Sequence, residues 1–213
     1  MASGEVALQA AECVVPGIAA ERVLVDQCRR GDPDAFARLV SLHEGMVFNL
    51  SARLLGDAEE AKDLSQEVFL QVYRHLGRFE GRSSLKTWIY RIVVNQCRNR
   101  RRWWRRRDGG RAASLDELTP AEEAKASGAS NGQESPLDQA CRRQRSRHVQ
   151  AALLSLPFHH RTVLVLREVE GLSCEAIASA LGLPEGTVKS RLARARESLR
   201  QRLMPALAEG SLS

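Results

Sequence analysis

The chain has 213 residues, enough for one large domain or two small ones, and a formal net charge of +6 that favours a polyanionic partner. No apolar run approaches the roughly 18 residues that a membrane-spanning helix needs, and residues 1–20 lack the cationic start of a secretory signal. Five scattered cysteines form no C-x-x-C pair, so we expect reduced thiols in a cytoplasmic protein without a disulfide framework, a metal site or a cofactor.

The first predicted helices follow residues 1–20, a segment that we expect to be a disordered tail and to which we assign no role. A short helix is predicted over residues 21–30. Asp32 is then typical of an N-cap, and Pro33 suits the first helical position because its missing N–H leaves no hydrogen bond unmade there. Apolar residues at helical spacing carry this second helix to Gly56.

A capping pattern opens the third helix. Asp57 and Glu60 have the spacing of a capping box, so we predict a helix over residues 58–76. A loop then leads to a fourth helix over residues 85–102. Strand-like alternation is absent, and residues 21–107 are therefore expected to form an all-α bundle.

The composition changes after this bundle. Glycine, serine and proline punctuate a polar stretch over residues 108–136, which is typical of a flexible linker. Helical periodicity resumes over residues 137–154 and 157–168, and residues 137–204 are expected to form a second domain before a tail at 205–213. The predicted fold class is all-α, with two small helical domains joined by a flexible linker.

A helix-turn-helix pattern spans Ser173 to Leu192. Gly182 supplies the dihedral that the turn requires, and the following helix has an apolar stripe that begins at Val188 and a cationic face opposite it. Such a helix suits the major groove of DNA, although a solvated helix of an ordinary bundle has the same two faces. The candidate DNA-reading residues are Thr187, Lys189, Ser190, Arg191 and Arg194.

The third predicted helix has an outer face of mixed character. Asp63, Gln66, Glu67 and Leu70 share the side opposite the apolar one. An apolar side chain among acids and amides is typical of an anchor for a partner protein. An acidic solvated face with one chance leucine explains the same pattern equally well, so the pattern alone leaves both interpretations open.

The fourth predicted helix carries an ordered polar stripe. Its members are Thr87, Arg91, Asn95, Arg98 and Arg102, bordered by Trp88 and Asn99. Guanidinium groups grip phosphates, amides pair with base edges, and an aromatic ring stacks on an unpaired base. The loop over residues 79–84 can hold an extruded nucleotide. The alternative places Trp88 in the core and the arginines in solvent, which the regular spacing disfavours.

In this order and across this linker, the three patterns resemble the extracytoplasmic-function (ECF) class of the bacterial sigma-70 family. These proteins are promoter-recognition subunits of RNA polymerase reduced to regions 2 and 4. The resemblance covers about Val23–Trp104 and Leu137–Leu203. It implies that residues 21–107 are region 2, that residues 137–204 are region 4, and that the chain is not an enzyme, because the polymerase makes the RNA.

The resemblance also implies how the chain meets the polymerase. The motif Asp63-x-x-Gln66-Glu67-x-Phe69 is similar to the family's contact with the β′ clamp helices, and region 4 is expected at the β flap. The implied core-polymerase-binding residues are Asp63, Gln66, Glu67, Phe69 and Leu70. An anti-sigma factor that covers these surfaces is a further implied partner.

The DNA contacts follow from the same resemblance. The implied minus-ten residues are Phe79, Trp88, Arg91, Asn95, Arg98, Asn99 and Arg102. Phe79, Trp88 and Asn95 are expected to line a pocket for a flipped non-template base, and residues 98–102 to hold the backbone. The implied minus-thirty-five residues are the five candidates of the second helix of the helix-turn-helix.

Two other classes of protein were weighed against this one. A stand-alone helix-turn-helix regulator binds duplex DNA as a dimer without polymerase, and it leaves the acidic face and the basic fourth helix unexplained. A small nuclease needs clustered carboxylates for metal, whereas the acids here are dispersed. Trp103 and Trp104, within the arginine run, receive no interpretation.

Overall fold

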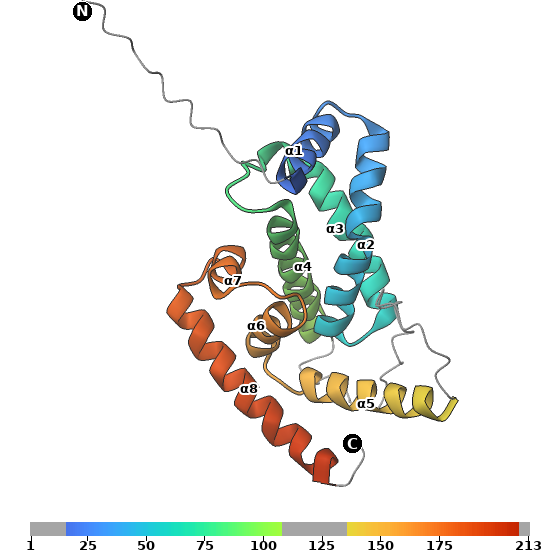
Figure 1. The fold of residues 1–213 in the computed structure, drawn as a ribbon, viewed down its shortest axis with the longest axis vertical. Helices are drawn as coiled ribbons and strands as arrows, with labels where there is room; N and C mark the ends of the chain where they lie inside the picture. The colour runs from blue at the N-terminus through green and yellow to red at the C-terminus, as the bar shows by residue number, and fades with distance from the viewer. Residues whose placement is uncertain (1–15, 108–135, 209–213) are drawn as a thin grey trace, which may run out of the picture.

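A computed structural model describes residues 16–107 and 136–208, which are almost entirely helical (Figure 1). The first group of helices comprises α1 (Pro16–Arg29), α2 (Pro33–Leu55), α3 (Ala58–His75), the 3-10 helix η1 (Leu76–Arg78) and α4 (Leu85–Arg107). The second group comprises α5 (Pro136–Leu154), α6 (Phe158–Glu168), α7 (Cys174–Leu181) and α8 (Glu185–Ala208). No strand occurs among these described residues, and the all-α fold class is confirmed.

The predicted helices are present, with small shifts of their ends. α1 begins at Pro16, inside the segment 1–20 that we expected to be a tail, and α8 continues to Ala208, beyond the expected domain boundary. α4 continues to Arg107, so the tryptophan pair lies on a helix. The rest of the predicted tails and linker lies outside the described residues, at positions 1–15, 108–135 and 209–213.

Side-chain caps determine where α2 and α3 begin. The Asp32 carboxylate accepts a hydrogen bond from the backbone N–H of Asp34 at 2.9 Å, and the Asp57 carboxylate accepts one from Glu60 at 3.0 Å. Gly56, between the two helices, has a φ of +86°, in the left-handed region where a side chain is strained. A glycine and an acidic cap therefore produce the tight turn between α2 and α3.

Replacing Asp57 with alanine should lower the free energy of unfolding by about 1 kcal/mol, because the Glu60 N–H at the start of α3 loses its acceptor. Asp57→Asn should retain most of the stability, since asparagine also caps helices well. Urea denaturation followed by circular dichroism measures both variants. Equal losses in the two would contradict the cap.

Apolar side chains form one continuous core through both groups of helices. Leu50 from α2, Leu64 from α3 and Ile89 from α4 are fully buried in its first half. Leu166 from α6 and Val188 from α8 are fully buried in its second half. Burial of these side chains is the main stabilising term for a helical protein of this kind.

The two groups of helices pack against each other (Figure 1). α7 lies alongside α4, while α5 and α6 contact α2. Leu154 at the end of α5 covers Gly56 so closely that a Cβ added to this glycine would lie 2.5 Å from the leucine Cδ1. The sequence led us to expect two compact units on a flexible tether, and it did not predict this packing. None of the described helices has both the length and the apolar character of a membrane-spanning segment.

Candidate nucleic-acid and polymerase interfaces

The outer face of α3 is exposed to solvent. Asp63, Gln66 and Glu67 are exposed, and the Leu70 side chain is 56% exposed. Phe69 differs from the other four predicted residues, because it is only 9% exposed and belongs to the core. Successive residues of a helix are about 100° apart, so Phe69 turns inward where Leu70 turns outward. We call Asp63, Gln66, Glu67 and Leu70 the α3 face.

Tyr73 lies beside the α3 face and was not predicted from the sequence. It follows Leu70 by three residues, which places it on the same side of the helix, and it is 61% exposed. Its ring meets that of Phe36 edge-on, with the ring centres 5.1 Å apart. The three-residue spacing from Leu70 could have identified it.

Two arginines near the end of α4 do not face the same way as their neighbours. Arg100 forms an ion pair with Glu67 of the α3 face at 2.6 Å. The Arg101 guanidinium lies over the ring of Phe158, with 4.7 Å between its central carbon and the ring centre. These two side chains therefore make contacts within the chain, and the expectation that residues 98–102 hold a DNA backbone stays a prediction.

The polar stripe of α4 is exposed over most of its length. Arg91, Asn95, Arg98, Asn99 and Arg102 are exposed, and we call these five residues the α4 stripe. Their spacing of three or four residues keeps them on one side of the helix, apart from Asn99 at its border. Among the described residues, no carboxylate forms an ion pair with Arg98 or Arg102. Both guanidinium groups are therefore available to an anion.

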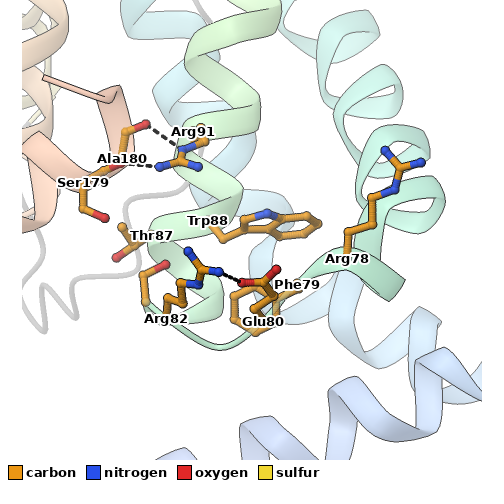
Figure 2. A pocket seen from close by; sticks show the side chains of 10 residues that line it. Arg78, Phe79, Glu80, Arg82, Thr87, Trp88, Arg91, Ser179 and Ala180 are labelled. Atoms are coloured by element: carbon orange, nitrogen blue, oxygen red, sulfur yellow. Dashed lines mark hydrogen bonds and ion pairs between the residues drawn. The ribbon is translucent and has the colours of Figure 1, made fainter.

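A pocket of about 410 Å³ lies beside the first turns of α4 (Figure 2). The rings of Phe79 and Trp88 line it, with their centres 5.4 Å apart and their planes tilted by 49°. Arg78 and Arg82 also line it; Arg82 lies in the loop over residues 79–84 that we predicted to hold a nucleotide, whereas Arg78, directly before Phe79, was not predicted. Asn95 lies two turns beyond Trp88 and is not among the lining residues, so the structure does not bring it together with Phe79 and Trp88 in this pocket.

Arg91 is oriented towards α7. Its Nε donates a hydrogen bond to the backbone carbonyl of Ala180 at 3.1 Å, and its Nη2 donates one to that of Ser179 (Figure 2). From the sequence we expected this side chain at DNA and predicted no contact within the chain.

The helix-turn-helix is present as predicted. The Ser173 hydroxyl accepts a hydrogen bond from the Ala176 N–H at 3.0 Å and caps α7, and Gly182 has a φ of +64° in the turn before α8. Val188 and Leu192 of α8 are buried against α6 and α7. The inner face of α8 is therefore committed to packing, and its outer face is left for a partner.

The outer face of α8 carries the predicted DNA-reading residues. Lys189, Ser190 and Arg194 are exposed, whereas Thr187 and Arg191 are half-buried. The Lys189 ammonium forms an ion pair with Glu185 one turn earlier, at 2.8 Å. This exposed pair lies on one helix, so it does not prevent the lysine from turning to a phosphate.

A second pocket, of about 340 Å³, lies between the α4 stripe and α8. Arg98, Arg102 and Arg191 line it together with His159. Burial lowers the pKa of His159, and the neighbouring Arg191 lowers it further, so the imidazole is neutral near pH 7. Three guanidinium groups thus share one pocket, and like charges at short distance repel each other.

Metal-ligating side chains do not gather in the part of the chain that the structure describes. Within residues 16–107 and 136–208, no three His, Cys, Asp or Glu side chains lie where they could hold one ion.

Comparison with known proteins gives two family matches. The model of Sigma-70 region 2 matches residues 39–108, and that of Sigma-70, region 4 matches residues 146–199. The RNA polymerase sigma-H factor of Pseudomonas aeruginosa is 38% identical over 189 residues, which are 89% of this chain and 96% of that protein. The ECF RNA polymerase sigma factor SigW of Bacillus subtilis is 34% identical, over 84% of this chain and 94% of its own.

Two solved structures are similar across both groups of helices. The sigma factor RpoE of Bartonella quintana, solved in complex with the anti-sigma factor NepR, has a TM-score of 0.61 and 25% identity, covering 79% of this chain and 96% of that one. CnrH, solved in complex with the cytosolic domain of CnrY, has a TM-score of 0.61 and 26% identity, covering 87% of this chain and 98% of that one.

Proposed function

Since this chain belongs to the ECF class of the sigma-70 family, we propose that its α3 face binds core polymerase and that its α4 stripe and α8 contact promoter DNA. The protein is an RNA polymerase sigma factor that acts in transcription initiation and is not an enzyme. The observation that carries this function is the match to sigma factors over nearly their whole length. We assign residues 21–107 to region 2 and residues 137–204 to region 4.

The α3 face supports a contact with the β′ clamp helices of the polymerase. An exposed leucine surrounded by polar side chains is typical of the centre of a protein interface, where one buried anchor contributes much of the affinity. Leu70 has this environment, and the exposed Tyr73 extends the apolar surface beside it. Arg100 holds Glu67 through an ion pair, which favours one orientation of this carboxylate before the polymerase binds.

The α4 stripe and the first pocket support melting of the minus-ten element. Arg98 and Arg102 are placed to grip phosphates, while Asn95 can pair with a base edge. The pocket beside Phe79 and Trp88 has two aromatic rings for a flipped base. Capture of that base offsets an unstacking cost on the order of a few kcal/mol. Asn95 therefore contacts the strand next to the captured base instead of the captured base itself.

The outer face of α8 supports recognition of the minus-thirty-five element in the major groove. Replacing Arg194 with alanine should weaken binding to a promoter duplex by about 1–3 kcal/mol and relax base preference at one position, because the guanidinium reads a base edge. Arg202→Ala is the matched control, since this exposed arginine lies two turns further along the same helix. Electrophoretic mobility shifts over a randomised minus-thirty-five element measure both. Equal losses with unchanged base preference would place Arg194 at a phosphate.

The partners and the place of action follow from the same function. Polymerase and promoter DNA lie in the cytoplasm, and we place this protein there. We further propose that an anti-sigma factor binds it, since the similar RpoE was solved with such a partner. Region 4 is assigned to the β flap of the polymerase.

Run-off transcription over a promoter library tests the function. Core polymerase supplemented with this protein should start RNA synthesis at a restricted set of sites that core polymerase alone does not select. Gel filtration of the mixture should show a stoichiometric complex, which a stand-alone helix-turn-helix regulator does not form. Start sites no more selective than those of core polymerase alone would refute the function.

A further inference from the structure

The pocket between the α4 stripe and α8 is cationic on one side and apolar on the other. Three guanidinium groups line it, those of Arg98 and Arg102 on α4 and that of Arg191 on α8. The apolar side chains that line it are Phe158, Leu181 and Leu183. Its volume of about 340 Å³ lies at the lower end of the range for small-ligand sites. The pocket therefore has the size and the mixed lining that suit a small charged molecule.

The three guanidinium groups have no counterion from the described part of the chain. Within residues 16–107 and 136–208, none of the three forms an ion pair or donates a side-chain hydrogen bond. Two nearby arginines differ, since Arg100 pairs with Glu60 and Glu67 and Arg196 pairs with Glu168. Cations that line one pocket repel each other, and an anion between them removes this repulsion. The pocket thus favours an anionic ligand.

The first turn of α6 adds to this preference. His159 lines the pocket, and its pKa is lowered by burial and by Arg191. An anion beside the imidazole opposes the effect of Arg191 and stabilises the protonated ring. α6 also begins without a side-chain cap, because Pro157 makes no such hydrogen bond, and the positive end of the helix dipole favours negative charge.

The number and geometry of the cations indicate which anion fits. Guanidinium groups bind phosphate oxygens through paired N–H donors, which gives both strength and orientation. Arg98 and Arg102 lie one turn apart on α4, and Arg191 approaches from another helix, so the three reach different oxygens. A single phosphate group carries about −1.5 to −2 at pH 7, less than three guanidinium groups neutralise, whereas two linked phosphoryl groups carry more.

We propose that this pocket binds a diphosphate group, supplied by inorganic pyrophosphate or by a nucleotide that carries one. The diphosphate lies among Arg98, Arg102 and Arg191, and the base of a nucleotide lies against the apolar wall. The site needs residues from both groups of helices, unlike a phosphate contact on the α4 stripe alone. It requires neither polymerase nor promoter DNA, so it does not depend on the function proposed above.

Isothermal titration calorimetry of the free full-length protein with sodium pyrophosphate tests the site. At physiological ionic strength we expect one pyrophosphate per chain. Its dissociation constant should be at least about 10-fold lower than that of orthophosphate, the effect of one additional charge-assisted contact. Sulfate is the second comparison, because it has the charge of a single phosphate group without a linked partner.

Two pairs of variants locate the site on the protein. Arg102→Ala and Arg191→Ala should each weaken pyrophosphate binding by about 10-fold or more, because each removes a charged donor. Arg105→Ala and Arg194→Ala are the matched controls, since each removes the same charge three residues further along the same helix and neither side chain lines the pocket. The controls should bind pyrophosphate within about 2-fold of the wild type, because salt screens distant charges. Circular dichroism verifies that all four variants are folded.

A histidine inside the pocket provides a local readout. The NMR signals of the His159 ring, assigned by comparison with His159→Gln, should shift when pyrophosphate is added. His75 is exposed on α3 and does not line the pocket, so its ring signals should stay in place. The same titration of Arg191→Ala should produce a much smaller shift of His159 at equal pyrophosphate concentration.

Adenosine diphosphate and adenosine monophosphate distinguish the two sources of the group. Tighter binding of the diphosphate nucleotide than of pyrophosphate assigns the site to nucleotides, and weaker binding assigns it to the inorganic anion. In both cases the monophosphate should bind at least about 10-fold more weakly than the diphosphate, because it lacks the linked phosphoryl group.

Three results would overturn the proposal. The first is pyrophosphate binding no tighter than that of orthophosphate, and the second is an equal loss in the pocket variants and their controls. The third is a loss confined to Arg102→Ala, which would place the anion on the α4 stripe alone. Gel filtration with core polymerase keeps these results apart from the proposed function, because a chain without the diphosphate site still joins core polymerase if that function is correct.

Discussion

Changing Leu70 to arginine should weaken the binding of core polymerase by at least about 30-fold, the effect of losing a central interface anchor. The side chain is 56% exposed in the α3 face, so the substitution leaves the core of the protein intact. A guanidinium at this point also brings a charge into an interface centre, where it lacks a partner. Titration of labelled protein with core polymerase measures the change in dissociation constant.

Val23→Arg is the control for this experiment. Val23 is 57% exposed on α1 and therefore matches Leu70 in character and exposure without belonging to the α3 face. We expect this variant to bind core polymerase as the wild type does. Similar losses in both variants, or no loss at Leu70, would show that the polymerase binds a different surface.

Replacing Asn95 with alanine should slow open-complex formation by about 10-fold or more, because an amide paired with a base edge contributes on the order of 1–3 kcal/mol. Binding to core polymerase should not change, since Asn95 lies on the α4 stripe and away from the α3 face. Fluorescence of 2-aminopurine within the melted segment follows the opening rate. The same samples can be titrated with core polymerase.

Gln96→Ala provides the comparison on the same helix. Gln96 is also an amide, but it is half-buried on the opposite side of α4 from the stripe. Its removal should leave the opening rate close to that of the wild type. If Asn95→Ala weakens opening and polymerase binding together, the separation of the two surfaces on α4 and α3 is incorrect.

Much of the fold could be predicted because helical signals are local. The apolar spacing of Val188 and Leu192 placed them on the buried side of α8, and both are buried. Caps and glycines act on their own neighbours, so the turns at Gly56 and Gly182 follow from a few adjacent residues. The same local geometry predicted that Asp63 and its three companions on the α3 face lie outside the core.

The candidate sites were predicted less completely, because each site combines residues from several segments of the chain. How these segments lie relative to each other depends on tertiary packing, which local sequence patterns do not specify. The 3-10 helix η1 and the loop before α4 bring Arg78 and Arg82 to the pocket with Phe79 and Trp88, while Asn95 lies too far along α4 to line it. Family likeness places these residues in one functional group, but it does not specify which of them share a cavity. Helical spacing placed Phe69 on the inward side of α3, where it is buried, whereas the family motif grouped it with the surface residues.

By itself the sequence determined the helices, the faces that they bury and the two kinds of partner that the exposed faces suit. Only the tertiary structure decided that the two groups of helices close over the α4 stripe. The physical reason lies in the acceptors: Arg91 and Arg161 bind backbone carbonyls, which every residue carries and which leave no signature in the order of side chains. A contact of this kind becomes visible only when distant segments are placed together in space.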